Sequence, residues 1–177
     1  MKARRFVPLA LAAVALGACG SSKETEVAAS YCPAPLTVQD ASRLTRFKAG
    51  AGRVPRVVMF EAVVVAADTA CTVSRNRMEV DVAVRIAVNA GPSIGQGVTR
   101  VPFFVRVVNG NGGIVVGRDE LADYKLSTAS PRGVSQEELS VTIPFSEVKD
   151  LGGYRIAVGL KPTAEELDYN RRAAVRQ

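Results

Sequence analysis

The sequence has no histidine, no tryptophan and only three cysteines among its 177 residues. Without histidine, neither a Ser-His-Asp nor a Cys-His catalytic arrangement can form, and zinc loses its usual nitrogen ligand. Long apolar runs are also absent. The apolar run Phe6–Ala18 has 13 residues and contains Pro8, whereas a membrane-spanning helix needs about 20. Histidine-dependent catalysis, zinc chemistry and a spanning helix in this run are therefore not expected.

This run has instead the features of a bacterial lipoprotein signal peptide. The cations Lys2, Arg4 and Arg5 precede it, and it ends in Leu-Gly-Ala directly before Cys19. This lipobox pattern predicts cleavage before Cys19, whose thiol then forms a thioether to diacylglycerol, with palmitate or a similar acyl chain on the freed amine. Two or three chains anchor a protein durably where one does not. The alternative is an ordinary secretory signal that happens to contain a cysteine.

The segment after Cys19 predicts where the protein resides. Gly20 follows the cysteine in place of the aspartate that retains lipoproteins in the inner membrane, which favours the periplasmic face of the bacterial outer membrane. Residues 20–30 are small, polar and without pattern, so they predict a flexible tether of under about 20 Å. We therefore expect a signal peptide at 1–18, a lipidated cysteine and tether at 19–31, and one domain at 32–177.

The formal net charge of +6 overstates the basicity of the mature chain. Half of it belongs to Lys2, Arg4 and Arg5 in the signal peptide, which contains no acid. The remaining excess is small, and the expected compartment holds no nucleic acid, so we expect no nucleic-acid partner.

The two remaining cysteines, Cys32 and Cys71, are predicted to form a disulfide in an oxidising periplasm. Closing a loop of about 40 residues would stabilise the fold by about 4 kcal/mol on the chain-entropy model. The alternative is two free buried thiols. Two thiols without histidine are too few ligands for a metal, and no cofactor is expected.

Alternating apolar residues predict an all-β domain. In Arg77–Asn89, valine and isoleucine at every second position face one way and charged residues the other, as in a half-buried strand. Val57–Ala67 is apolar on both faces and predicts a central strand, while Pro102 suggests an edge or a bulge in the strand Val98–Val108. Further strands are expected at Ile114–Gly117, Leu121–Leu126, Glu138–Ile143 and Tyr154–Leu160, with a hairpin turn at Asn109–Gly113.

These strands favour an antiparallel two-sheet sandwich of the immunoglobulin or fibronectin-III kind, with a small β-barrel as the alternative. Leu151–Tyr154 is loosely similar to the tyrosine corner of such domains. Thr163 and Glu166 form a capping box that predicts a short helix over about 164–174. We expect this helix to cover a sandwich edge through Leu167 and Ala174.

No motif carries an enzyme mechanism. Ser146 and Lys149 match Ser-x-x-Lys, but the partner elements of penicillin-binding enzymes are absent, so a turn is expected there. Paired acids at Glu79 and Asp81, and at Asp119 and Glu120, are expected to be solvated. A hydrolase that uses carboxylates alone would need two of them facing each other across a cleft.

One cluster invites a binding interpretation. Five cations occur within 14 residues without an acid among them, namely Arg43, Arg46, Lys48, Arg53 and Arg56. The cluster is close to the anchor in sequence, which suggests that it lies near the bilayer and contacts anionic headgroups. A solvated basic loop is the alternative.

Six segments of the mature chain can be compared with known proteins, namely Cys32-Pro33, Asp40–Phe47, Phe60–Ala62, Gly91-Pro92, Val101–Val105 and Glu166–Arg172. Together they resemble landmarks of a family of small outer-membrane lipoproteins of alphaproteobacteria. The resemblance covers nearly the whole mature chain and implies location and architecture but no mechanism. It also suggests that the tail motif, Tyr169, Asn170, Arg171 and Arg172, matters beyond capping a helix.

The sequence therefore predicts a non-enzymatic envelope lipoprotein that serves as an interaction or assembly module. Its partners would be the membrane, through Cys19, and an envelope protein. The alternative function is binding of a lipid, a glycan or peptidoglycan.

Overall fold

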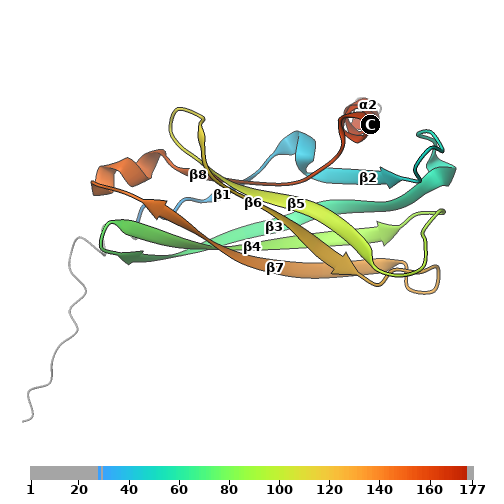
Figure 1. Cartoon of the computed structure of the whole chain (residues 1–177), viewed down its shortest axis with the longest axis horizontal. Coiled ribbons are helices and arrows are strands. Elements are labelled where there is room, and N and C mark those ends of the chain that lie inside the picture. Colours follow the sequence, from blue (N-terminus) through green and yellow to red (C-terminus); the bar gives the residue numbers. More distant parts are fainter. Residues whose placement is uncertain (1–27, 29, 175–177) are drawn as a thin grey trace, which may run out of the picture.

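A computed structural model describes Ala28 and residues 30–174, which form an elongated sandwich of two four-stranded sheets (Figure 1). The first sheet has the order β1-β8-β5-β6, and the second has the order β2-β3-β4-β7. The strands of the first sheet are β1 (Pro35–Thr37), β8 (Arg155–Leu160), β5 (Thr99–Val108) and β6 (Ile114–Tyr124). The strands of the second sheet are β2 (Arg43–Phe47), β3 (Val58–Ser74), β4 (Arg77–Ala90) and β7 (Arg132–Pro144).

The expected sandwich is confirmed, since the strands form two separate sheets and the described chain closes no barrel. All strand pairs are antiparallel except β1 with β8, which is parallel. Immunoglobulin domains have the sheet orders A-B-E-D and C-F-G. The order here differs, because three consecutive strands, β2, β3 and β4, are neighbours in one sheet. The likeness to those domains therefore lies in the two-layer architecture.

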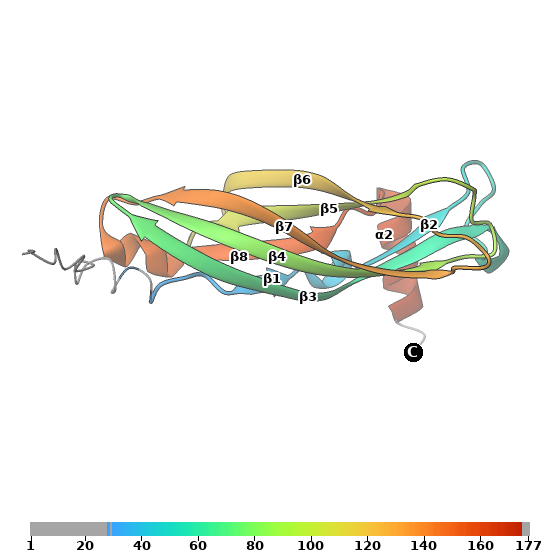
Figure 2. The same cartoon turned by 90° about the horizontal axis from the view of Figure 1, so that it is seen from below.

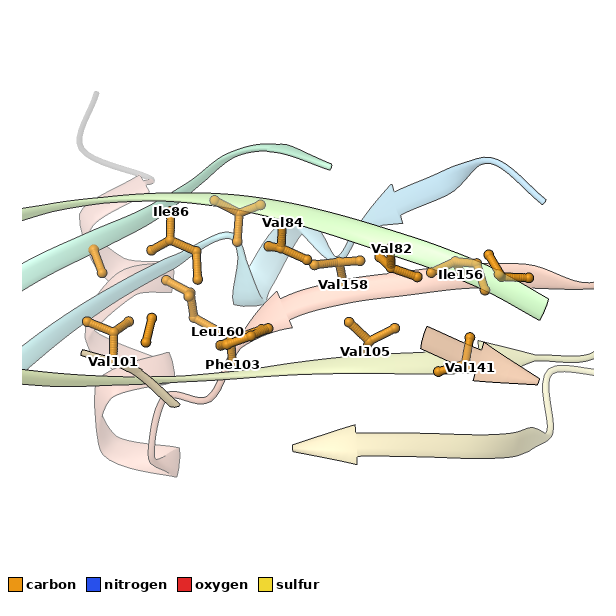
Figure 3. Close-up of a cluster of buried hydrophobic side chains, with 14 of the residues drawn as sticks. Val82, Val84, Ile86, Val101, Phe103, Val105, Val141, Ile156, Val158 and Leu160 are labelled. Atoms are coloured by element: carbon orange, nitrogen blue, oxygen red, sulfur yellow. The ribbon is translucent and has the colours of Figure 1, made fainter. Parts of the chain in front are cut away.

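The core fills the space between the sheets. Val82, Val84 and Ile86 on β4 point toward β5, where Val105 points back (Figure 3). Each of these four side chains is at most 1% exposed. Because alternate residues of a strand face the same side, the period-two pattern of the sequence translates directly into this packed layer.

Short helices complete the chain. They are η1 (Gln39–Ala41), η2 (Pro55–Val57), η3 (Val148–Gly153) and α2 (Ala164–Ala174). α2 begins at the predicted capping box, in which Thr163 N donates to Glu166 Oε2 and Glu166 N to Thr163 Oγ1. It runs across the strand direction beside β2 (Figure 2). Leu167 is half-buried, and the side chain of Ala174 lies outside the described part.

Several strand boundaries differ from the expectation. β6 runs unbroken from Ile114 to Tyr124, because an edge strand tolerates the charged stretch Arg118–Glu120 that separated two predicted strands. β3 extends to Ser74 and β7 begins at Arg132, both through stretches whose side chains are only half-buried. β1 and β2 were not predicted, because strands of three and five residues show too little alternation.

Candidate functional site

The described chain begins at one end of the sandwich, where the predicted disulfide is confirmed. Cys32 and Cys71 are bonded, with their Cα atoms 5.7 Å apart. Thr69 Oγ1 also donates to Pro33 O at 2.9 Å. These contacts hold the start of the domain against the last part of β3. We call this end the proximal end. Cys19 lies outside the described residues.

The five cations lie at the opposite end, which we call the distal end. Arg43 and Arg46 are on β2, Lys48 and Arg53 follow it, and Arg56 is in η2 (Figure 1). β2 pairs with the first residues of β3, whereas Cys71 is about 13 residues further along β3. At 3.3 Å per residue this separation is about 40 Å. The cluster is therefore far from the disulfide, although Arg43 follows Cys32 by only 11 residues, and its placement near the bilayer stays a prediction.

The structure brings the cation cluster and the tail motif together. Arg46 Nε lies 3.0 Å from Glu166 Oε1, and Glu166 is only 3% exposed. Arg53 pairs with Glu165 on the same helix. Because a buried carboxylate is costly unless it is paired, Arg46 and the capping box together make the burial of Glu166 tolerable. Part of the cluster thus holds α2 and is not free for other anions.

The tail motif binds α2 to β2 and to η1 by three kinds of contact. The ring of Tyr169 meets that of Phe47 edge-on, with centroids 4.9 Å apart. Asn170 Nδ2 donates to Arg43 O at 2.9 Å, and Arg171 pairs with Asp40 at 2.6 Å. Asn170 therefore satisfies a carbonyl on the free edge of β2.

The remaining members of the two sets stay exposed. The side chains of Arg43, Lys48, Arg56 and Arg172 form no ion pair within the part of the chain that the structure describes. Lys48 and Arg56 are therefore available to an external anion at the distal end.

A groove of about 400 Å³ opens at this distal end, between the two sheets. Apolar side chains dominate its lining, and neither Asp nor Glu contributes to it. Its lining residues are Arg46, Phe47, Ala49, Met59, Phe60, Ile94, Gly95, Gln96, Val98, Thr99 and Arg100. The volume is within the range of small-molecule and peptide-side-chain pockets. Sequence reasoning named only Arg46 among these residues as a site residue.

The groove exists because β8 is shorter than β5. β8 pairs with β5 from Val108 back to Phe103, and Lys161 N still donates to Pro102 O at 2.9 Å. The chain then leaves the sheet toward α2. Thr99, Arg100 and Val101 consequently pair only with β6, on the other side of β5. Pro102 was the available signal, because it marks the point where pairing on one side of an interior strand ends.

Arg100 presents to this vacated position a backbone N–H and C=O that have no hydrogen-bond partner among the described residues. Along a strand, alternate residues direct their N–H and C=O to the same neighbour. Since Pro102 O accepts from Lys161 on the β8 side, the N–H and C=O of Arg100 point to that side too. Its guanidinium lies 3.6 Å from Asp123, in an exposed pair that contributes little to stability.

The loop between β4 and β5 forms one wall of the groove. Gly91 N donates to Met59 O at 2.8 Å, and Ser93 N donates to Val58 O at 2.9 Å. Ser93 Oγ also donates to Arg56 O. These bonds tie the loop to the beginning of β3, so the groove has a fixed wall.

The other candidate groups lie outside the groove. Glu79 and Asp81 are exposed on β4, where Ser140 Oγ donates to Asp81. Asp119 pairs with Arg106 and Lys161 on the outer face of the first sheet. Lys149 pairs with Glu147 at 2.6 Å in the segment around η3. No group of three possible metal ligands occurs among the residues that the structure describes.

A smaller groove of about 240 Å³ lies at the proximal end, beside Tyr31, Cys32 and Leu151. It also has no acidic lining residue. In the described chain, no helix has the length and apolar character needed to cross a bilayer.

The class that fold and site define is a β-sandwich with an apolar, cation-rimmed groove at the end remote from its N-terminal disulfide. Compared with protein-family models, curated proteins and solved structures, the chain matches none of them.

Proposed function

We propose that this protein is a non-enzymatic lipoprotein, anchored through Cys19 at the periplasmic face of the outer membrane, that serves as an interaction or assembly module of the cell envelope. The observation that carries the proposal is the placement of the groove about 40 Å along β3 from the disulfide. An anchor at the proximal end would hold the groove away from its own membrane, where an envelope partner can reach it.

The sequence supports the anchoring part of this proposal. The cationic start, the short apolar run and Leu-Gly-Ala before Cys19 agree with lipoprotein processing, and Gly20 favours the outer membrane. The tail motif and the segment Asp40–Phe47, which carry the resemblance to outer-membrane lipoproteins of alphaproteobacteria, meet in the structure at the contact of α2 with β2. The family proposed from that resemblance would therefore share this contact.

A second candidate is a binding module for a lipid, a glycan or peptidoglycan. The groove favours it, because an apolar lining beside the weakly paired Arg100 suits an amphiphilic anion. A hydrolase that uses carboxylates alone has less support, because neither groove has an acidic lining residue.

The first experiment tests the anchor. Cells producing the full chain or its Cys19→Ser variant are fed an alkyne-tagged fatty acid and then fractionated. The full chain is expected to be labelled and to sediment with outer membranes, whereas the variant is expected to be unlabelled. An unlabelled full chain that still carries residues 1–18 would contradict the proposal.

The second experiment tests the interaction role. Envelopes are treated with a membrane-permeant cross-linker, and the full chain is captured and analysed by mass spectrometry. We expect one protein to be recovered repeatedly in a stable complex with the full chain. The same protein should not be recovered when the Val98→Asp variant is captured instead. Recovery of bulk lipid alone would favour the second candidate.

A further inference from the structure

We propose that the distal groove accepts an extended acidic segment of a partner protein, which adds to β5 as an antiparallel strand in the place that β8 leaves empty. This inference rests on the proposed function as an interaction module, and it names the surface and the chemistry of the partner. Addition of a strand to an exposed sheet edge is an established mode of peptide recognition.

The backbone of β5 supplies the hydrogen bonds. β8 continues to Leu160 opposite Phe103, and beyond it Arg100 has a free N–H and a free C=O directed toward the groove. An added strand that continues the antiparallel direction of β8 would place one residue opposite Arg100 and exchange two hydrogen bonds with it.

The side chains around Arg100 determine the pattern of the added strand. Thr99 and Val101 face inward and are buried, whereas Arg100 is exposed on the outer face. A residue directly opposite another on an antiparallel pair points to the same face. The residue opposite Arg100 therefore faces outward, and its neighbours face the apolar groove lined by Phe47, Ile94 and Val98.

Charge complementarity selects acidic residues for the outward positions. Arg100 is held only by its weak exposed pair with Asp123, and Lys48 and Arg56 lack an ion pair in the described chain. No carboxylate lines the groove. A segment that alternates carboxylates with small apolar side chains complements both the exposed Arg100 and the apolar groove.

The other sheet edges are less accessible to a partner strand. α2 covers the edge of β2, where Asn170 already bonds to Arg43 O. β6 carries Arg118 and Glu120 opposite the inward-facing Val105 and Phe103, and inward charges are a common protection of edge strands. β1 has only three residues, and β7, the remaining edge, carries Glu137 opposite the inward-facing Val84. The vacated position beside Arg100 is therefore the preferred edge.

The test uses a defined probe, an acetylated and amidated six-residue peptide of alternating glutamate and valine. The full protein recovered from cells in a zwitterionic detergent is titrated with it and observed by amide NMR. Shifts confined to residues 94–101 are expected. A peptide with lysine in place of glutamate is the charge control and is expected to bind at least about tenfold more weakly.

Two methylated peptides test the strand geometry without altering the protein. In an antiparallel pair the glutamates lie opposite Arg100, so methylation of their backbone nitrogens removes a hydrogen bond and is expected to weaken binding about fivefold to tenfold. Methylation of the valine nitrogens, which face the other way, is expected to have little effect. Equal affinities of the two peptides, or weaker binding of the valine-methylated one, would overturn the proposal.

Variants of the protein add an independent check. Arg100→Ala removes only the charge, whereas Arg100→Pro removes the charge and the backbone N–H. Arg100→Pro should therefore bind the glutamate–valine peptide about five times more weakly than Arg100→Ala does. Val98→Asp in the groove is expected to abolish binding, whereas Val134→Asp, on the similarly exposed Val134 of β7, should leave it unchanged. Equal binding by both members of either pair would contradict the inference.

The remaining outcomes separate this inference from the proposed function. If the peptide leaves residues 94–101 unperturbed while a stable envelope complex is still captured, the strand site is wrong and the interaction role stands. If anionic phosphatidylglycerol vesicles perturb these residues and the peptide does not, the groove binds lipid and the inference fails. Dimerisation through these residues in the absence of peptide would also overturn it.

Discussion

At the scale of single residues, Gly91 decides the position of one wall of the distal groove. A Cβ on Gly91 would lie 2.3 Å from Val58 O, a backbone atom that cannot move aside cheaply. The close approach is what lets the loop between β4 and β5 lie against β3. In the sequence, Gly91-Pro92 was notable only as part of the family resemblance, because the steric reason for the glycine lies 33 residues earlier in the chain, at Val58.

Gly91→Ala should therefore destabilise the protein by about 1–3 kcal/mol, because the loop must move away from β3. Chemical unfolding followed by circular dichroism measures this change. Gly95→Ala is the matched control, since a Cβ there meets nothing within 4 Å. The same loss of stability in both variants would show that the contact with Val58 is not the cause.

Asp119 makes part of the stability depend on pH. The hydrogen bond from Lys161 Nζ at 2.6 Å, and then that from Arg106, lower the pKa of the Asp119 carboxyl below its ordinary range. A carboxyl whose pKa is lower in the folded than in the unfolded chain stabilises the fold above its ordinary pKa. This contribution disappears as the pH falls through the lowered value.

Asp119→Asn should accordingly be less stable than the parent protein near pH 7. The difference should begin to shrink as the pH falls below about 4 and disappear below the lowered pKa of Asp119. Urea midpoints of both proteins, measured between pH 7 and pH 3, test this dependence. Asp81→Asn, on the other sheet, is the control for loss of a surface carboxylate. A difference that stays constant down to pH 3 would contradict the assignment to ionised Asp119.

At the scale of elements, α2 is the part whose position depends on side chains distant in sequence. Its existence follows from the capping box, which is local and readable. Its site on β2 depends on the pairs of Arg46 with Glu166 and of Arg171 with Asp40, which join residues more than 100 positions apart. Such pairs leave no periodic trace in the sequence.

Strand prediction has the same limit. β4 and the inner row of β7 were readable because a filled core requires alternation of apolar residues. β2 is short and its residues Arg43 and Arg46 are charged, so the segment looked like a basic loop. The groove was not predictable, because it results from the difference in length between β5 and β8 and not from any motif.

Tyr169→Ala should loosen α2 from β2, because it removes the edge-on ring contact with Phe47. Loss of an aromatic pair and its buried area should weaken the docking by about 1–2 kcal/mol. Hydrogen exchange of the amides of β2, followed by mass spectrometry, is expected to accelerate. Arg172→Ala, which removes an exposed side chain of the same helix, should leave the exchange unchanged. Equal acceleration in both would indicate fraying of the helix and not loss of this contact.

At the scale of the whole molecule, β3 is a rigid spacer between two ends with different chemistry. The disulfide of Cys32 and Cys71 joins the tether side to the late part of β3, and the groove lies beside its first residues. Because β3 pairs along its length with β4, a movement of one end relative to the other would require breaking an extended ladder. The groove is thus held at a fixed distance from the disulfide.

This geometry makes a prediction about the protein on a membrane. In the proposed lipoprotein Cys19 is acylated and the other two cysteines are bonded, so an introduced cysteine is the single free thiol. Fluorophores are attached to Lys149→Cys in η3 and, separately, to Gly95→Cys in the groove wall. In phosphatidylcholine vesicles with spin-labelled headgroups, the label at 149 should be quenched more strongly, since the label at 95 lies about 40 Å further along the strands.

Equal quenching of the two labels would mean that the sandwich lies flat on the bilayer. Stronger quenching at 95 in anionic vesicles would mean that Lys48 and its neighbouring cations bind headgroups, in which case the groove would face the membrane and not a protein partner.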